Sequence, residues 1–468
     1  MCFRFHVLIT ISMLALASSS VHADEQLRKD AAEAMKRAAT YYRTKVATHG
    51  GYVYYYALDL QQRWGEGEAT RDQIWVQPPG TPTVGMAYLR AFEATGDRFY
   101  LDAARDAALA IVYGQLESGG WTNSIDFNPR GKVAKYRNGK GAGRNYSTFD
   151  DGISQAALQL LMRTDQALSF KNKEIHEAVE IGLAALLKAQ FPNGAFPQVW
   201  IGPSAPQPIL KASFPDYDWR TEKKIKNYWD MYTLNDNVAG TVTAMLRDAQ
   251  RIYKDDRYKA ALAKLGDFLI LAQLPSPQPG WAQQYNYEMK PIWARKFEPA
   301  AITGGEAQDV MEALIAIAQI TGDDRYLKPI PPALEYYRKS LLPDGKLARY
   351  YELKTNRPLY MKRTGKDYTL TYDDTSLPNH YGWKIASRLD AIEAAIKKPA
   401  IPPPPSAKSL EPKVREFIRS LDAESRWIST HDGSPMVGQP PFKAGREYIG
   451  SEVFSRNVEM LSEFLLAK

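Results

Sequence analysis

The chain has 468 residues, a formal net charge of +7 and a single cysteine, Cys2. Because Cys2 lies in the leader described next, thiol catalysis, disulfides and cysteine-bound zinc are excluded, and six scattered histidines argue against a transition-metal site. The modest positive balance fits an acidic polymer as partner, although a solvated basic surface explains it equally well.

Residues 1–23 have the pattern of a cleavable secretory signal. A charged start is followed by the apolar run 7–17 and by a small-x-Ala ending at residues 21–23. The run is short for a bilayer span, which makes a membrane anchor the weaker alternative. We therefore expect a secreted or periplasmic protein that begins at Asp24 and does not associate with a membrane.

Helix pairs repeat along the chain. Three helical stretches open on an Asp-Arg-aromatic sequence, and each ends at a glycine turn that leads to an aromatic residue. The openings are Asp97-Arg98-Phe99, Asp256-Arg257-Tyr258 and Asp324-Arg325-Tyr326, and the turns are Gly120-Trp121, Gly280-Trp281 and Asp344-Gly345 before Tyr350. Between them lie further helices with apolar stripes.

Repeated helix pairs form either an open solenoid or a closed ring. The turns at one end of the pairs are tight, whereas the loops 121–147, 200–232 and 281–299 at the other end are long and aromatic. We therefore predict an all-α fold, an (α/α) toroid with little β structure over residues 24–399, and a cleft on the rim where the long loops gather. An open solenoid scaffold is the alternative.

Residues 400–468 are predicted to form a Pro-rich spacer and a C-terminal extension. The run Pro402–Pro405 stops the preceding helix, and the residues after it contain a short amphipathic helix, a turn-rich segment and a last helix. A segment of this size and composition has too few apolar residues to bury a core of its own. We expect it to pack on the helical domain.

Acidic clusters begin two equivalent helices of the repeat. Asp150-Asp151 precedes one helix and Asn235-Asp236-Asn237 precedes the next. Helix N-capping accounts for one such cluster. Two clusters with spare carboxylates on one rim indicate a calcium site, because calcium takes hard oxygen ligands. A glycosidase that pairs Asp150 or Asp151 with Asp236 as acid and base also remains open, since sequence does not give the carboxyl separation.

The loop 280–306 carries aromatic, amide and basic side chains. Trp281, Tyr285 and Trp293 offer flat faces to sugar rings, and the neighbouring Arg295-Lys296 pair offers cations to carboxylates. The alternative is an ordinary loop whose aromatic residues fill the core.

Six cations without an intervening acid occupy one loop: Arg130, Lys132, Lys135, Arg137, Lys140 and Arg144. Such a loop is often simply solvated, but on the same rim as acidic metal ligands its arginines could bind substrate carboxylates. Nucleic acid is not expected as a partner, because the chain has no helix-turn-helix or RNP signature.

Four strings in the chain resemble the pectate lyases of polysaccharide lyase family ten, and the resemblance covers roughly residues 24–399. They are Ser147-Thr148-Phe149-Asp150-Asp151-Gly152, Tyr232-Thr233-Leu234-Asn235-Asp236-Asn237, Trp293-Ala294-Arg295-Lys296-Phe297-Glu298-Pro299 and Ala348-Arg349-Tyr350-Tyr351-Glu352-Leu353-Lys354-Thr355-Asn356-Arg357-Pro358. The last string is the most specific. The resemblance implies an α/α toroid that cleaves polygalacturonate by calcium-assisted β-elimination.

The resemblance also implies roles for individual residues. Arg295 looks like the base that removes the C5 proton, and Arg349 and Arg363 look like clamps on uronate carboxylates. Asp150 and Asp236 look like the calcium-contacting carboxylates, with Asp151 and Asn235 close by. Asp151 stands where an asparagine is usual, and residues 201–229 look like an addition.

Trp281, Tyr285 and Lys296 are expected to contact the sugar chain, and we expect a monomer. Two other functions stay open at this point. One is a hydrolase of uronic-acid oligosaccharides on the same toroid, and the other is a non-catalytic pectin-binding protein.

Overall fold

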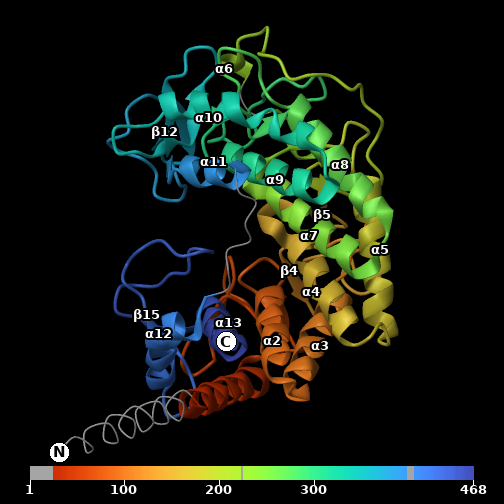
Figure 1. Cartoon of the computed structure of the whole chain (residues 1–468), viewed down its shortest axis with the longest axis vertical. Helices are drawn as coiled ribbons and strands as arrows, with labels where there is room; N and C mark the ends of the chain where they lie inside the picture. Colours follow the sequence, from red (N-terminus) through yellow and green to blue (C-terminus); the bar gives the residue numbers. More distant parts are fainter. Residues whose placement is uncertain (1–24, 223–224, 398–404, 468) are drawn as a thin grey trace, which may run out of the picture. The chain divides into compact units, whose positions relative to one another are not determined.

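The computed structural model describes residues 25–222, 225–397 and 405–467 (Figure 1). The predicted leader 1–23 therefore lies outside the described residues, as does all of the Pro402–Pro405 run except its last residue. None of the helices in the described part combines the length and apolarity needed to cross a bilayer. The chain divides into two compact units, one of residues 25–75, 79–110 and 405–467, and one of residues 76–78 and 111–397 with the gap noted above.

The first unit combines both ends of the described chain. Its elements are a helix over residues 25–41, η1 (Tyr42–Val46), β1 (Tyr55–Tyr56), β2 (Arg63–Trp64), β3 (Gln73–Trp75), α2 (Thr81–Thr95), most of α3 (Arg98–Tyr113), α12 (Ala407–Ser420), β15 (Ile428–Thr430), β16 (Glu447–Gly450) and α13 (Ser451–Leu466).

The C-terminal segment is integral to this unit. Helix α13 packs against α2 and α12, and β16 lies between β15 and β1 in a sheet of order β15-β16-β1-β2. The Arg28 guanidinium donates hydrogen bonds to three carbonyls at the end of α13, at 2.9–3.2 Å. It thereby satisfies acceptors that a helix end leaves free. The boundary at residue 399 stays a prediction.

The second unit is built from helix pairs. Its helices are α4 (Ile153–Ala167), α5 (Lys173–Ala189), α6 (Trp219–Glu222), α7 (Val238–Tyr253), α8 (Asp256–Leu271), α9 (Glu306–Thr321), α10 (Ile330–Lys339) and α11 (Leu389–Lys397), with the short 3-10 turns η2 (Asp150–Gly152), η3 (Tyr228–Asp230), η4 (Asn235–Asn237) and η5 (Asp324–Leu327). Helix α4 packs on α5, α7 on α8, and α9 on η5, which leads into α10. The predicted all-α class of repeated helix pairs is confirmed.

The first helices of successive pairs contact one another. Helix α7 packs between α4 and α9, and the 3-10 turn η4 at its start contacts both η2 and α9. Buried residues such as Val242, Met245 and Leu246 form the stripe of α7 that makes these contacts. The starts of α4, α7 and α9 are thereby brought together, which is what places the acidic clusters side by side.

Aspartates cap the predicted Asp-Arg-Tyr openings, from the position just before each of them. The side chains of Asp255 and Asp323, not Asp256 and Asp324, accept hydrogen bonds from the backbone two residues on. Each cap lies three residues before a buried tyrosine, Tyr258 or Tyr326. The capping aspartate and the buried tyrosine together fix where each helix begins.

The aromatic residue after each glycine turn anchors the fold. The indole N–H groups of Trp121 and Trp281 donate to the carbonyls of Ile111 and Leu269, both at 2.8 Å. The chain must come close at this turn, because a Cβ on Gly280 would lie 2.4 Å from the Tyr337 hydroxyl. The repeat seen in the sequence thus reflects a repeated core contact.

Short strands join the rim loops. They are β4 (Ser124–Asp126), β5 (Ser147–Thr148), β6 (Val199–Trp200), β7 (Tyr232–Thr233), β8 (Gln284–Tyr285), β9 (Ala301–Thr303), β10 (Leu347–Ala348), β11 (Tyr350–Glu352), β12 (Pro358–Thr364), β13 (Asp367–Thr371) and β14 (Lys384–Ile385). The hairpin β12–β13 is longer than expected and extends a sheet of order β13-β12-β11-β9. In this sheet β9, which follows the loop of Arg295, pairs with β11, which follows Arg349.

The predicted addition 201–229 lies along the loop that carries Arg295. Backbone N–H groups of Ala212, Ser213 and Ile225 donate to the carbonyls of Leu271, Met289 and Trp293, at 2.8, 3.1 and 3.0 Å. Within the described part of this segment, Arg220 forms an ion pair with the buried Glu352. The segment therefore supports the wall of the site.

Candidate active site

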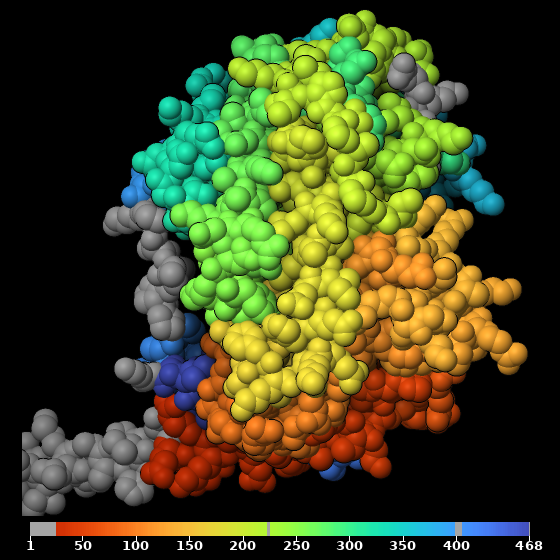
Figure 2. Space-filling view, turned by 90° about the vertical axis from the view of Figure 1, so that its right-hand side faces the viewer, coloured from red at the N-terminus to blue at the C-terminus, as the bar shows by residue number. Residues whose placement is uncertain are grey.

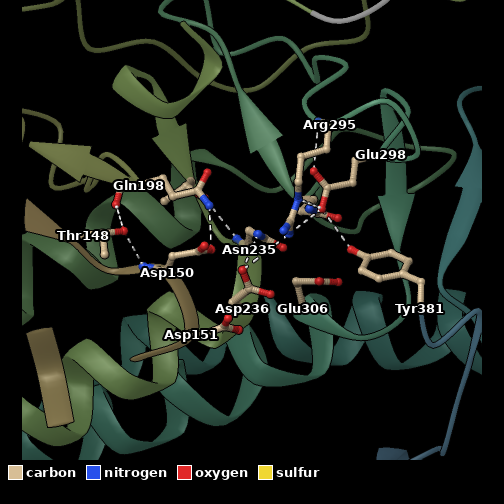
Figure 3. A network of polar contacts seen from close by, with 12 residues as sticks. Thr148, Asp150, Asp151, Gln198, Asn235, Asp236, Arg295, Glu298, Glu306 and Tyr381 are labelled. Atoms are coloured by element: carbon tan, nitrogen blue, oxygen red, sulfur yellow. Dashed lines mark hydrogen bonds and ion pairs between the residues drawn. The ribbon is translucent and has the colours of Figure 1, made fainter. Parts of the chain in front are cut away.

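The two acidic clusters adopt the same backbone structure (Figure 3). In each, a threonine hydroxyl accepts a hydrogen bond from the backbone two residues on: Thr148 from Asp150 at 3.0 Å, and Thr233 from Asn235 at 3.2 Å. The next residue, Asp151 or Asp236, has positive φ, 47° or 51°. Such backbone is costly for a residue other than glycine and is concentrated at functional sites.

Amide side chains hold two of the carboxylates. Gln198 Nε2 donates to Asp150 Oδ1 at 2.6 Å, and Gln77 Nε2 donates to Asp151 Oδ2 at 2.9 Å. Burial raises the pKa of Asp236 well above its usual range, and the nearby carboxyls of Asp150 and Asp151 raise it further, although Arg295 partly opposes them. A cation between these carboxylates would relieve their repulsion.

Arg295 faces this group of carboxylates. Its Nη2 lies 3.6 Å from Asp236 Oδ2, and its Nε and Nη2 both lie 2.7 Å from Glu298 Oε1. The backbone N–H of Arg295 donates to Glu298 Oε2 at 3.0 Å. Burial by itself lowers the pKa of Arg295, but Glu298 and Asp236 more than offset burial, so the pKa lies above its ordinary value. The guanidinium is therefore fixed in place and cationic in the resting protein.

Tyr381 connects Arg295 to a second arginine. Its hydroxyl donates to Glu298 Oε1 at 3.0 Å, and its ring centroid lies 4.1 Å from Cζ of Arg349. Nη2 of Arg349 donates to Oε1 of Glu306, the first residue of α9, at 2.7 Å. Burial raises the pKa of Tyr381 well above 10, so this hydroxyl stays a donor. Figure 3 shows the resulting row from Asp150 to Tyr381.

The site contains oxygen atoms suited to calcium. Within the described part of the chain, Asn235 Oδ1, Gln198 Oε1 and Glu306 Oε2 are buried and have no hydrogen-bond partner. Unpaired buried oxygens are costly, and amide and carboxylate oxygens are ligands that calcium prefers. The described residues contain no cluster of three His, Cys, Asp or Glu side chains in a ready-made metal geometry. The donor set nevertheless fits calcium better than a transition metal.

Two predicted substrate contacts are wrong. Trp281 and Tyr285 are both fully buried, at 0 % exposure. The Tyr285 hydroxyl accepts from the backbone of Ala282 and donates to the Ala272 carbonyl, at 2.6 and 2.7 Å. Tyr351 makes the equivalent contacts with Ala348 and Ser340. These aromatic residues are core anchors, as the alternative reading of the loop held.

Lys296 and Arg363 lie together at the turn of the β12–β13 hairpin. Both are exposed, and their side chains bond to the turn of the β12–β13 hairpin: Lys296 Nζ to the Lys366 carbonyl at 3.2 Å, and Arg363 Nε to the Gly365 carbonyl at 3.0 Å. Lys296 Nζ also lies 3.6 Å from Asp367. They form a cationic patch at the hairpin turn rather than part of the row in Figure 3.

Sequence reasoning missed several members of the site. Glu298 lies three residues after Arg295 in a string that the resemblance singled out, so its spacing could have indicated an ion pair. Glu306 is the first residue of α9, and α9 packs against the acidic turn η4. Gln198 and Tyr381 come from loops without any distinctive pattern, and only the fold brings them to the site.

Residues 115–347 match a family model described as pectic acid lyase. The chain belongs to this family. It is a polysaccharide lyase, and the predicted resemblance is confirmed. The matched residues of this pectic acid lyase include Asp150, Asp236, Arg295 and Glu298, whereas Arg349 lies just beyond them. A search of curated proteins finds no match.

Several solved structures are similar to this pectic acid lyase. A family 10 polysaccharide lyase from Cellvibrio cellulosa is 20% identical, with 68% of this chain and 96% of that chain covered and a TM-score of 0.46. A mutant of that lyase in complex with trigalacturonic acid is also 20% identical, with 67% and 98% covered and a TM-score of 0.47. A sugar epimerase from a ruminal bacterium is 12% identical, with 95% and 98% covered and a TM-score of 0.49.

Proposed function

We propose that this lyase is exported, acts as a monomer and cleaves α-1,4-linked polygalacturonate by β-elimination. In this proposal Arg295 removes the C5 proton, and calcium binds between Asp150, Asp151, Asn235 and Asp236. The observation that carries the proposal is the 3.6 Å approach of Arg295 Nη2 to Asp236, where the starts of α4, α7 and α9 meet. Because the two groups are this close, the base and the anionic oxygen ligands of the calcium ion can act on the same sugar.

Arg295 has one nitrogen left for the substrate. Its Nε and Nη2 are engaged by Glu298, while Nη1 has no hydrogen-bond partner among the residues that the structure describes. In the elimination, Nη1 of neutral Arg295 takes the C5 proton and the C5 electron pair forms the 4,5 double bond. The bond from C4 to the glycosidic oxygen breaks, and that oxygen leaves on the adjoining sugar with the bonding electrons and takes a proton from water. Because Glu298 keeps the resting guanidinium protonated, the neutral form is scarce, and the rate should rise with pH.

A calcium ion in this site would neutralise the uronate carboxylate and so lower the cost of negative charge beside C5. The chain offers Asp236 and the unpaired oxygens of Asn235 and Gln198 to hold it. Arg349, held by Glu306 and by the ring of Tyr381, supplies a fixed cation for a carboxylate in the same row of side chains. The exposed patch of Lys296 and Arg363 serves a sugar farther along the chain.

A hydrolase on this scaffold is not favoured by the geometry. The Asp150 carboxyl is close enough to Asp236 to raise the pKa of the Asp236 carboxyl. Glycosidases separate their two carboxyls by about 5 Å or more so that the scissile bond, and in inverting enzymes a water, fits between them. Two carboxyls close enough for one to raise the pKa of the other suit a shared cation instead.

One assay tests the proposed function. The protein is incubated with polygalacturonate in calcium or in EDTA, and both ultraviolet absorbance and reducing ends are followed. We expect absorbance from a 4,5-unsaturated uronide that disappears on chelation and returns with calcium. Reducing ends without absorbance would indicate a hydrolase, and absorbance that survives EDTA would contradict the metal assignment.

Export and oligomeric state are tested separately. N-terminal sequencing of the protein recovered outside the cytoplasm should begin at Asp24, and size-exclusion chromatography should give one mass near that of a single chain. A retained Met1 would contradict the leader, and a stable larger species would contradict the monomer.

A further inference from the structure

A basic loop next to the site has no role in the proposed reaction. We call residues 127–146 the basic arm. Two of its six cations are paired within the described chain, Lys135 with Glu117 at 3.1 Å and Arg137 with Glu177 at 3.0 Å. The other four are exposed and form no ion pair with any residue that the structure describes: Arg130, Lys132, Lys140 and Arg144. The arm therefore presents unneutralised charge.

The basic arm is a folded loop and not a loose one. Backbone N–H groups of Gly141, Ala142 and Gly143 donate to carbonyls of its first half, at 2.8–3.1 Å. The buried Tyr136 hydroxyl accepts from the Asp126 N–H at 2.7 Å. A Cβ on Gly141, whose φ is +77°, would lie 2.2 Å from a backbone oxygen. A loop this closely packed holds its cations at fixed places, which lowers the entropy cost of binding.

Both ends of the arm are tied to the acidic turn. On one side, Thr148, which lies two residues before Asp150, donates its N–H to the Trp121 carbonyl at 3.0 Å. On the other, Gln77 N–H donates to the Asn123 carbonyl at 3.2 Å, and the Gln77 side chain donates to Asp151. The arm thus leaves the fold beside the site, and Figure 2 shows these light-orange residues at the molecular surface with side chains projecting into solvent.

The end of the arm nearest the site combines an aromatic ring with a guanidinium. Tyr146 is 45 % exposed, and Cζ of Arg144 lies 5.8 Å from its ring centroid. Asn145, between them, accepts a hydrogen bond from the Ser118 N–H at 2.8 Å, which fixes the backbone. An apolar ring face beside a cation is complementary to a uronic acid, which has an apolar sugar face and a carboxylate.

We infer that the basic arm binds the part of a polyuronate chain that extends past the reacting sugar, with Tyr146 and Arg144 nearest the site and Arg130, Lys132 and Lys140 on later carboxylates. The inference rests on the proposed function, because it takes the same substrate. A loop that recognised any polyanion would need only the charge. The exposed ring at the site end favours a sugar chain.

The test compares a long and a short substrate. A variant with Arg130→Gln, Lys132→Gln, Lys140→Gln and Arg144→Gln is matched by a control with Arg247→Gln, Lys259→Gln, Lys264→Gln and Lys328→Gln. The control removes four exposed charges from α7, α8 and the turn before α10 of the same unit. For each protein, kcat/KM is measured on long polygalacturonate and on trigalacturonate. The ratio of the two values isolates binding beyond the reacting sugars.

We expect the ratio to fall about tenfold or more in the arm variant, mainly through KM, because four exposed charge contacts each contribute a few-fold. The control should keep the wild-type ratio. Added salt should lower the wild-type ratio and hardly change that of the arm variant. Tyr146→Ala should lower the ratio without any change of charge.

An unchanged ratio in the arm variant, or an equal fall in the control, would overturn the inference. A second contradicting result would come from Tyr146→Ala. If this variant kept the wild-type ratio and was retarded like the wild type in a gel containing dextran sulfate, the arm would be a general polyanion surface. If the fourfold variant does not fold, the pairs Arg130/Lys132 and Lys140/Arg144 are replaced separately. Absence of unsaturated product from both substrates with the wild type would instead refute the proposed function.

Discussion

Glu298 fixes the Arg295 guanidinium through the Nε, Nη2 and backbone contacts described above, at 2.7–3.0 Å, and is itself 1 % exposed. It touches the base and not the sugar, so it is a positioning residue. We expect Glu298→Gln to lower kcat about 100-fold with little change in KM, because a small misplacement of a catalytic group costs that much.

Tyr381→Phe is the matched control, since it removes one hydrogen bond to the same carboxylate and should cost roughly tenfold or less. Both variants are assayed at several substrate concentrations, and Glu298→Asp should recover part of the rate. A normal kcat in Glu298→Gln, or equal loss in both variants, would show that Glu298 does not orient Arg295.

The burial of Tyr285 predicts a purely structural role. Tyr285→Phe keeps the ring and removes two hydrogen bonds to backbone groups. We expect the free energy of unfolding to fall by about 1–3 kcal/mol, because two buried backbone groups lose their partner. KM for polygalacturonate should stay at the wild-type value. Urea denaturation and initial rates measure the two effects, and a raised KM with normal stability would restore this residue to the binding site.

An ion pair joins three helices at their far ends. His176 on α5 contacts the fully buried Asp165 of α4 at 2.8 Å, and the Tyr253 hydroxyl at the end of α7 donates to the same carboxylate. Hydrogen bonding to Asp165 raises the pKa of His176 above 6.5, although burial opposes the rise. The pair therefore stabilises the fold below about pH 6.5 and loses this effect as pH rises through the raised pKa.

We expect the difference in Tm between wild type and His176→Gln to depend on pH. At about pH 5.5 the variant should melt lower, and at about pH 9, where the histidine is neutral in both states, the difference should largely vanish. A difference that is the same at the two pH values, or larger at pH 9, would contradict the ion pair.

Among the elements, the sequence predicted the helix pairs, the long rim loops and the acidic helix starts, because these depend on periodicity and local capping. It did not separate a core tryptophan from a sugar platform, since Gly280-Trp281 reads the same in both roles. The available signal was Trp121, which holds the equivalent position in the repeat. The structure shows that both tryptophans make the same indole hydrogen bond. Tyr381 and Gln198 reach the site through long-range packing that no local pattern encodes.

At the scale of the whole molecule, the chain forms two units, and the C-terminal residues complete the first one. Helix α13 buries Phe454, Val458 and Leu461 in the unit where it packs on α2. We expect Leu461→Ala to lower the free energy of unfolding by about 2–5 kcal/mol, as for other buried leucines.

Glu452→Ala, at an exposed position of the same helix, should change this free energy by less than about 1 kcal/mol. Urea denaturation of both variants provides the measurement. An unchanged midpoint in Leu461→Ala would mean that the extension adds nothing to the stability of the first unit.

The proposed elimination depends on Arg295 as the group that removes a proton from carbon. The most direct measurement is the rate of unsaturated product formation by the wild type and by Arg295→Lys, with calcium present, from about pH 6 to 10. We predict that the wild-type kcat/KM rises with pH, because the neutral fraction of a group with a raised pKa grows, and that Arg295→Lys loses about 1,000-fold or more in kcat. A flat wild-type profile, or near-normal turnover by Arg295→Lys, would contradict it.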